Sequence, residues 1–215
     1  MLAGLIATFV IPFLLGSIPW GLVIGKLVYH TDIREAGSGN IGTTNAMRVM
    51  GKGAGIAVFV LDFGKGLLSG FIAVCVATVC LEGDISSTFA WVAPRDFLAL
   101  SFIGCVSGHI YSPWLGFHGG KGIAVAVGCL FFVFGVLGAV IELALFAVLV
   151  VATRRVSVGS IAAAVLCPFL ALYWYWGDPF GWVLVSAAAV LVFWAHRANM
   201  QRLLAGTEPR IGSHA

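Results

Sequence analysis

Long apolar runs separated by short polar segments dominate this chain, and they decide the environment in which it can fold. The runs cover residues 2–28, 54–81, 97–106, 123–152, 161–176 and 180–195. A helix needs about 20 apolar residues to cross a bilayer. Only 10% of the residues are charged, against roughly a quarter in a soluble domain. We therefore predict an all-α integral membrane protein, with residues 1–215 forming one membrane-embedded domain.

The run over residues 123–152 decides the predicted topology, because it is too long for one relaxed span. We expect it to turn back near residues 138–142 and to form two short helices of about 15 residues each. Every one of the 12 lysines and arginines except Arg95 then lies on one side of the membrane, or, for Lys65, in the nearer half of its span. The positive-inside rule makes that side cytoplasmic. The prediction is seven transmembrane helices, with the N-terminus outside and the C-terminus in the cytoplasm.

Two short segments bear on this topology. No basic segment precedes the apolar stretch of residues 1–24, and Lys26 follows it, so we interpret the stretch as a permanent first span and not a secretory signal. The third run, residues 97–106, is too short to cross alone. We expect residues 107–112 to supply the missing length inside the membrane, shielded by protein.

Three glycine-rich polar blocks interrupt the apolar sequence. The first block is residues 37–45 with Arg48, the second is residues 108–109 with 117–122, and the third is residues 196–199 with Arg202. Irregular polar backbone at membrane depth is tolerated where it lines a site. All three blocks fall on the predicted cytoplasmic side and are rich in groups that bind phosphate. The sequence therefore predicts a membrane enzyme that acts on phosphorylated substrates.

The first block has the composition of an anion site. Its glycines free backbone N–H groups to converge on an anion, and Arg48 offers a two-pronged donor for phosphate oxygens. The side-chain donors are Ser38, Asn40, Thr43, Thr44 and Asn45. The chain from Thr44 onward is predicted to be helical, which aims a helix N-terminus at the same anion. A plain surface loop is the alternative, disfavoured because no acidic residue lies between residues 37 and 52.

The second block places glycines and Lys121 at the start of an apolar helix. This resembles a phosphate loop in its physics, although the Walker A spacing is absent. His109 and His118 are candidates for proton transfer or for a hydrogen bond to phosphate. Interfacial polar residues without a catalytic role are the alternative for both.

The third block repeats polar residues every three positions at the end of the last span. His196, Asn199 and Arg202 are predicted to share one broad helix face. Glu208 follows and is expected to pair with Arg202 or with a substrate hydroxyl. A solvated basic helix end is the alternative.

Weaker signals lie elsewhere. Asp62 and Lys65 stand one turn apart inside the second span, where unpaired charge is expensive, and a structural ion pair is our interpretation. Ser157 and Ser160 either add hydroxyls to the site or cap a helix. The five cysteines fall inside apolar runs without metal-binding spacing, and we expect them to be small core residues.

At these residues the chain resembles the bacterial acyl-phosphate:glycerol-3-phosphate acyltransferase family (PlsY). The matching positions are Ser38-Gly39-Asn40, Gly42, Thr44-Asn45, Arg48, Gly108-His109, Phe117, Gly119-Gly120-Lys121-Gly122, His196-Arg197, Asn199, Arg202-Leu203, Gly206 and Glu208. Three positions depart from the family pattern: His118 replaces a usual lysine, Val125 a usual threonine, and Ser112 a usual proline. The family has seven spans with its motifs facing the cytoplasm.

The resemblance implies transfer of a fatty acyl group from acyl phosphate to the 1-hydroxyl of glycerol 3-phosphate. The products are lysophosphatidic acid and inorganic phosphate, in the first committed step of phospholipid biosynthesis. It implies no cofactor, no metal, and no use of acyl-CoA or acyl carrier protein. We expect a monomer in contact with membrane lipid and near the enzyme that makes acyl phosphate, with no nucleic-acid partner.

The candidate residues and the competing interpretations follow from these motifs. The candidate substrate-binding residues are Ser38, Gly39, Asn40, Thr44, Asn45, Arg48, Gly119, Gly120, Lys121, Ser157, Ser160, His196, Asn199, Arg202 and Glu208. Among these we expect Arg48, Lys121 and Asn199 to hold phosphate. Direct attack by the glycerol hydroxyl is the expected mechanism, with His109, His196 or a substrate phosphate oxygen taking the proton. A covalent acyl-Ser38 is the rival mechanism, and a phosphate or organophosphate transporter is the rival function, ahead of a purely structural membrane subunit.

Overall fold

The protein is described by a computed structural model that covers residues 1–82 and 92–212, and these ranges contain helices and no strand. The α-helices are α1 (Leu2–Ser17), α2 (Trp20–Val28), α3 (Thr43–Met50), α4 (Lys52–Glu82), α5 (Pro94–Ile110), α6 (Ile123–Val133), α7 (Gly135–Thr153), α8 (Val156–Trp174), α9 (Pro179–Ala195) and α10 (Arg197–Leu204), with short 3-10 turns η1 (Ile33–Glu35) and η3 (Pro113–Leu115). The all-α prediction is confirmed for the described residues.

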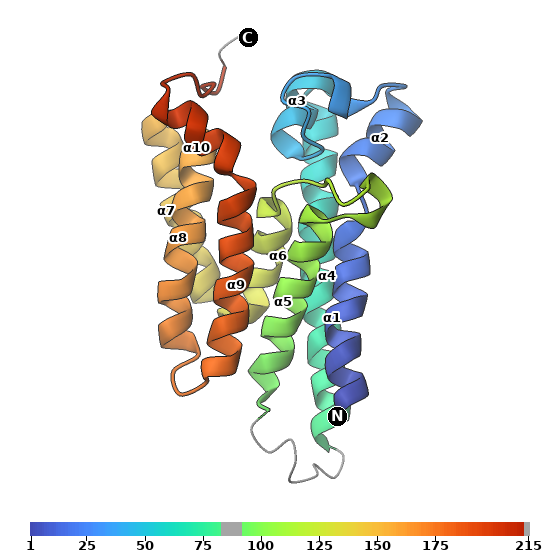
Figure 1. The fold of residues 1–215 in the computed structure, drawn as a ribbon, viewed down its shortest axis with the longest axis vertical. Helices are drawn as coiled ribbons and strands as arrows, with labels where there is room; N and C mark the ends of the chain where they lie inside the picture. Colours follow the sequence, from blue (N-terminus) through green and yellow to red (C-terminus); the bar gives the residue numbers. More distant parts are fainter. Residues whose placement is uncertain (83–91, 213–215) are drawn as a thin grey trace.

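The long helices run along one axis of the molecule, with the start of α1 at one end and α10 at the other (Figure 1). The short helices α2, α3 and α10 gather at the end opposite the start of α1. By length and composition four segments suit a membrane crossing: Leu2–Val28, Lys52–Leu81, Gly135–Thr153 and Val156–Trp174, with α9 and α10 together as a possible fifth. Helices α5 and α6, which the predicted topology also counts as crossings, are shorter.

The predicted turn near residues 138–142 is wrong in position. The chain breaks at Phe134 and Gly135, so that α6 has 11 residues and α7 has 19. Gly135 has a φ of 63°, a left-handed conformation that glycine adopts without a Cβ clash. Gly138 instead lies inside α7, where an added Cβ would stand 2.3 Å from the Cβ of Phe134. The glycine at the turn therefore decided the break.

The three-residue spacing of the third block predicted that it continues the last span on one helix face. The structure instead places most of the block on a separate helix. Helix α9 ends at Ala195, and α10 departs from it with a bend of 52°. His196 lies at the bend as the cap between the two helices. Helix α5 continues to Ile110. The predicted shielding of residues 107–112 by protein is confirmed for residues 107–110 and Ser112, which are buried, and is wrong for Tyr111, which is exposed.

Glycines let the central helices approach closely. An added Cβ on Gly66 of α4 would lie 2.2 Å from the carbonyl oxygen of Val125 in α6, and one on Gly128 of α6 would lie 2.2 Å from that of Phe63. Small residues at such contacts allow helix packing in membranes.

Three of the cysteines are buried as expected, whereas Cys75 is exposed and Cys80 is half-buried.

Candidate active site

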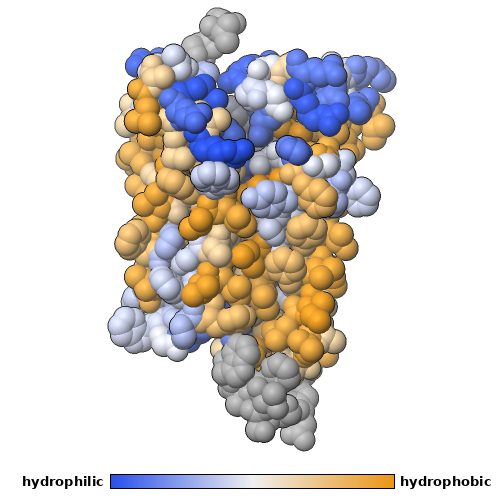
Figure 2. Space-filling view, in the orientation of Figure 1, coloured by the Kyte–Doolittle hydropathy of each residue, from blue (hydrophilic) through white to orange (hydrophobic). Residues whose placement is uncertain are grey.

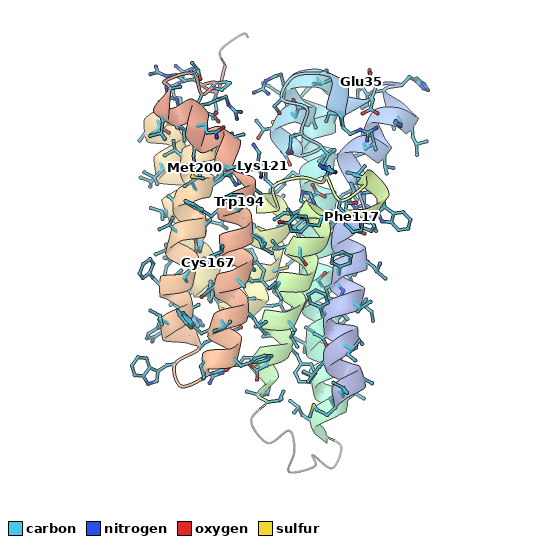
Figure 3. The ribbon with its side chains drawn as sticks, in the orientation of Figure 1. Glu35, Phe117, Lys121, Cys167, Trp194 and Met200 are labelled. Carbon is cyan, nitrogen blue, oxygen red and sulfur yellow. The ribbon has the colours of Figure 1, made fainter. Side chains whose placement is uncertain are left out.

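A cavity of about 620 Å³ lies at the polar end of the molecule, and residues from all three blocks line it. Hydrophilic side chains gather on the surface at this end, on both sides of a hollow, while the surface below is mostly apolar (Figure 2). Lys121 lies in the gap between the α9–α10 side and the α3–α4 side (Figure 3). The structure therefore brings together segments that are far apart in sequence.

Thirteen of the predicted site residues line this cavity. They are Ser38, Asn40, Thr44, Asn45, Arg48, His109, Lys121, Ser157, Ser160, His196, Asn199, Arg202 and Glu208. Gly39, Gly119 and Gly120 do not line it, and His118 also lies outside. Thr43, Asp62 and Arg210 line the cavity as well, although they were not among the predicted site residues. The donor-rich block around Thr43 and the charge inside a span at Asp62 are the sequence signals that pointed to two of them.

Gly119 and Gly120 seat the second block on the end of α5. The Gly119 N–H donates to the carbonyl oxygen of Ile110 at 2.8 Å, and the Gly120 N–H to that of His109 at 3.0 Å. An added Cβ on Gly120 would stand 2.1 Å from Nε2 of His109. Both N–H groups are used within the protein and do not point to the predicted contact with substrate. Gly120 instead packs against the imidazole of His109, and Gly119 packs against the backbone at the end of α5.

Asn45 organises the first block. Its Nδ2 lies 2.9–3.1 Å from three backbone carbonyl oxygens, those of Ile33, Ala36 and Asn40, which share its two hydrogens, and its Oδ1 accepts from the Ser38 N–H at 2.8 Å. The side chain is buried at the start of α3. Because the whole amide is committed to the loop backbone, Asn45 shapes the cavity wall and has no donor left for an anion.

The C-terminal tail completes the third block through Glu208. One carboxylate oxygen accepts from the Asn199 amide at 2.7 Å, and the other pairs with Arg202 Nε at 2.7 Å. The predicted Glu208–Arg202 pair is thus confirmed. Arg155 Nε donates to the Glu208 carbonyl at 3.3 Å and holds the tail in place. The Asn199 Oδ1 atom is buried without a hydrogen-bond partner among the described residues.

The two serines at the start of α8 face the cavity. The N-cap of α8 is Arg155 and has no side-chain capping bond, so the capping alternative for Ser157 and Ser160 is wrong. Ser160 Oγ donates to the Val156 carbonyl at 3.1 Å. Both hydroxyls lie beside the third block.

Positive charge exceeds negative charge in the cavity wall. Its bases are Arg48, Lys121, Arg202 and Arg210, and its acids are Asp62 and Glu208. Asp62 is paired with Lys65 at 2.9 Å, and Glu208 is paired with Arg202. Arg48 and Lys121 make no hydrogen bond or ion pair within residues 1–82 and 92–212.

The charges shift the titration of the groups they surround. Burial, together with the positive charges of Arg202 and Arg48, lowers the pKa of Lys121 to about 8, and Glu208 opposes that shift. Burial raises the pKa of the Glu208 carboxyl, but the hydrogen bonds from Asn199 and Arg202 and the positive charge of Arg202 oppose that effect, and the pKa is lowered overall. Both groups are therefore charged at neutral pH.

His109 of the second block and His196 of the third block both line the cavity. His109 is buried beside the Asp62–Lys65 pair, with its Nδ1 3.1 Å from Lys65 Nζ. His196 is buried with its Nδ1 2.8 Å from the Val192 carbonyl oxygen. The predicted Asp62–Lys65 ion pair is confirmed, and Asp62 lines the cavity.

Ser38 has no activating base in this arrangement. Its hydroxyl makes no hydrogen bond to a histidine, or to any other group, in the described part of the chain. An activated serine normally lies within hydrogen-bond reach of a base. The geometry therefore favours a role for Ser38 in the wall of the cavity.

Comparison with known proteins adds independent evidence. The family model described as "Glycerol-3-phosphate acyltransferase" matches residues 6–206. A protein named glycerol-3-phosphate acyltransferase from Thermosynechococcus vestitus is 40% identical over 219 residues, covering 99% of this chain and 97% of the relative. One of the same name from Rhodopseudomonas palustris is 37% identical, covering 99% and 98%.

Two solved structures are similar along almost the whole chain. Both are crystal structures of PlsY (YgiH), described as an integral membrane glycerol 3-phosphate acyltransferase, in a glycerol 3-phosphate form and a lysophosphatidic acid form. Each is 33% identical to this chain and covers 97% of it, with TM-scores of 0.81 and 0.76. This chain covers 96% and 95% of theirs.

Proposed function

This chain belongs to the glycerol-3-phosphate acyltransferase family, and we propose that it transfers a fatty acyl group from acyl phosphate to the 1-hydroxyl of glycerol 3-phosphate. The products are lysophosphatidic acid and inorganic phosphate, which begins phospholipid biosynthesis. No metal, acyl-CoA or acyl carrier protein takes part. The relatives carry an acyltransferase name, which favours this enzyme over a transporter of phosphate compounds.

The observation that carries the proposal is the surplus of positive charge in the cavity. Asp62 and Glu208 are neutralised by basic neighbours, whereas the Arg48 guanidinium and the Lys121 ammonium have no partner among the described residues. Arginine binds phosphate oxygens in a two-pronged fashion, and lysine acts as a point charge. Both substrates carry a phosphate group, so a cavity whose wall holds two such cations suits the pair.

The unpartnered acceptors in the wall suit the glycerol hydroxyls. Asn199 donates its amide hydrogen to Glu208 and keeps a buried Oδ1 without a partner. A hydroxyl is a donor that this oxygen can accept from. The sequence predicted that Asn199 binds phosphate. We propose instead that its Oδ1 accepts a hydrogen bond from a glycerol hydroxyl. The Thr43 hydroxyl is likewise buried and without a partner in the described ranges.

Acyl transfer proceeds by direct attack. The hydroxyl oxygen bonds to the carbonyl carbon of acyl phosphate, the bond from that carbon to the phosphate oxygen breaks, and inorganic phosphate leaves with the electron pair. The hydroxyl proton passes to a histidine or to a substrate phosphate oxygen. Catalysis comes from positioning and from neutralising the charge on the departing phosphate.

The protein is a multi-pass membrane protein, and its finer placement is part of this proposal. Helix α1 and the helices from α4 to α9 cross a bacterial inner membrane seven times as a monomer, with the N-terminus outside. The cavity then opens on the cytoplasmic side. The basic side chains at that end, and Arg95 at the other, agree with the positive-inside rule.

The test is product stoichiometry with purified protein in detergent or lipid. Palmitoyl phosphate and glycerol 3-phosphate should yield equal amounts of phosphate and lysophosphatidic acid, unaffected by a chelator. Arg48→Ala should abolish the reaction, and Arg34→Ala, whose side chain pairs with Asp32 away from the cavity, should not. Formation of phosphate without lysophosphatidic acid would indicate a hydrolase. If neither product forms, a transporter becomes the favoured function.

A further inference from the structure

The acid–base roles of the two cavity histidines differ because each Nδ1 atom meets a different kind of partner. Histidine tautomers follow from the groups that face the ring nitrogens. Around His109 that group is the Lys65 ammonium, and around His196 it is the carbonyl oxygen of Val192.

The Lys65 ammonium donates to the Ile18 carbonyl oxygen, contacts His109 Nδ1 and forms an ion pair with Asp62, whose Oδ1 has no hydrogen-bond partner among the described residues. Its Nζ lies 2.9 Å from Asp62 Oδ1, 2.9 Å from the Ile18 carbonyl oxygen and 3.1 Å from His109 Nδ1. An ammonium group has three donors and no acceptor. The buried pair with Asp62 keeps Lys65 charged, because an uncompensated carboxylate at this depth is costly. Nδ1 of His109 is therefore left to accept.

The consequence for His109 is a neutral ring with its proton on Nε2. A proton on Nδ1 would point at the ammonium, and a doubly protonated ring would add a second positive charge beside it. The Nε2 edge packs on Gly120, next to Lys121, where the ring lines the cavity. From this position His109 can donate a hydrogen bond to a substrate oxygen. Its one lone pair, on Nδ1, faces Lys65 and is not available to take the hydroxyl proton.

We propose that Lys65, held by Asp62, is a positioning residue that fixes His109 as a neutral Nε2–H donor to a substrate phosphate or carbonyl oxygen. The inference rests on the proposed acyl transfer and narrows it, because it removes His109 from the candidates for general base. The Asp62–Lys65 ion pair of α4 thus orients His109 in addition to its structural role.

His196 has the opposite arrangement. A carbonyl oxygen only accepts, so the contact with Val192 places the proton on Nδ1 and leaves the Nε2 lone pair free. The glycerol proton therefore goes to His196 Nε2 or to a phosphate oxygen of a substrate, while His109 keeps its own proton throughout.

Nitrogen NMR of the full-length protein, labelled with ¹⁵N-histidine in lipid nanodiscs, tests the assignment without relying on activity. We expect the His109 signals, identified by their loss in His109→Gln, to show a protonated Nε2 and an unprotonated Nδ1 at neutral pH. A protonated Nδ1 on His109 would overturn the proposal. So would an unchanged His109 spectrum in folded Lys65→Met. The spectrum remains informative even if the protein had no acyltransferase activity.

Kinetics then test what the tautomer does. Glutamine places an N–H donor near the Nε2 position and is no base, so His109→Gln should retain kcat/KM about tenfold above that of His109→Ala, the size expected for one hydrogen bond to a charged group. Equal losses in the two variants would contradict a donor role. Lys65→Met should lower kcat more than it raises KM, whereas Lys52→Met, on the exposed start of the same helix, should leave both unchanged. A Lys65→Met effect on KM alone would refute positioning.

Discussion

The Asn199 amide and the Glu208 carboxylate are joined by a buried hydrogen bond of 2.7 Å that ties the C-terminal tail to α10. The same carboxylate pairs with Arg202. A tail that follows the last helix thereby becomes part of the cavity wall, and it orients two residues of the third block at once.

Glu208 variants should show graded losses. Glu208→Gln keeps an acceptor for Asn199 but loses the charge that holds Arg202, and a hydrogen bond to a charged group contributes about 1.5–3 kcal/mol. We expect kcat/KM to fall about tenfold in Glu208→Gln and further in Glu208→Ala. Glu35→Gln, on an exposed residue outside the cavity, is the control. Wild-type kinetics in Glu208→Ala would contradict the role given to the tail.

The pH dependence of substrate binding should report Lys121. Its pKa of about 8 means that the ammonium is present at neutral pH and is lost as the pH rises through that value. KM for the phosphorylated substrates should therefore increase on the alkaline side. In Lys121→Arg the cation persists, because arginine does not titrate in this range, and the alkaline limb should move upward. Identical profiles for the two proteins would show that another group titrates.

Arg155 should matter through the backbone of the tail. Its Nε donates to the Glu208 carbonyl, and it lies at the start of α8. Arg155→Ala should raise KM by a few-fold, since one hydrogen bond contributes about 1 kcal/mol. Gln201→Ala, on an exposed position of α10, should behave as wild type. Steady-state kinetics of both variants decide the matter, and a larger effect in Gln201→Ala would contradict it.

The close contact between α4 and α6 makes a prediction about stability. In Gly66→Ala the new methyl group would meet the Val125 carbonyl oxygen, and overpacking of this kind costs about 1–3 kcal/mol. We expect a lower midpoint of thermal unfolding in detergent. In Gly64→Ala, on the same helix, an added Cβ meets nothing within 4 Å, so the midpoint should be unchanged or higher. Equal midpoints for the two variants would argue against a glycine-dependent contact.

The sequence predicted the features that depend on local chemistry. The three donor-rich blocks, the helix after Gly42 and the Asp62–Lys65 pair were all readable from residue type and spacing. Their meeting in one cavity followed from charge placement, because only one arrangement put all the blocks on the same side.

The features that depend on tertiary contact were not readable. The break falls at Gly135 and not at Gly138, because Gly138 packs inside α7, where an added Cβ would lie 3.3 Å from Trp174 of α8. The bend at His196 was likewise not marked by the residue spacing of the third block. Asn45 bonds to the carbonyl oxygen of Ile33, and Lys65 contacts His109, so each of these interactions joins residues that are many positions apart. A donor in a motif therefore identified a site more reliably than it identified a ligand contact.

Direct transfer is the central claim, and a single-turnover experiment tests it. Enzyme in excess over palmitoyl phosphate, without glycerol 3-phosphate, should be quenched rapidly and analysed by intact-protein mass spectrometry. The account predicts unmodified protein, followed by lysophosphatidic acid once glycerol 3-phosphate is added. A palmitoyl adduct on Ser38 that forms and decays at the rate of turnover would contradict it.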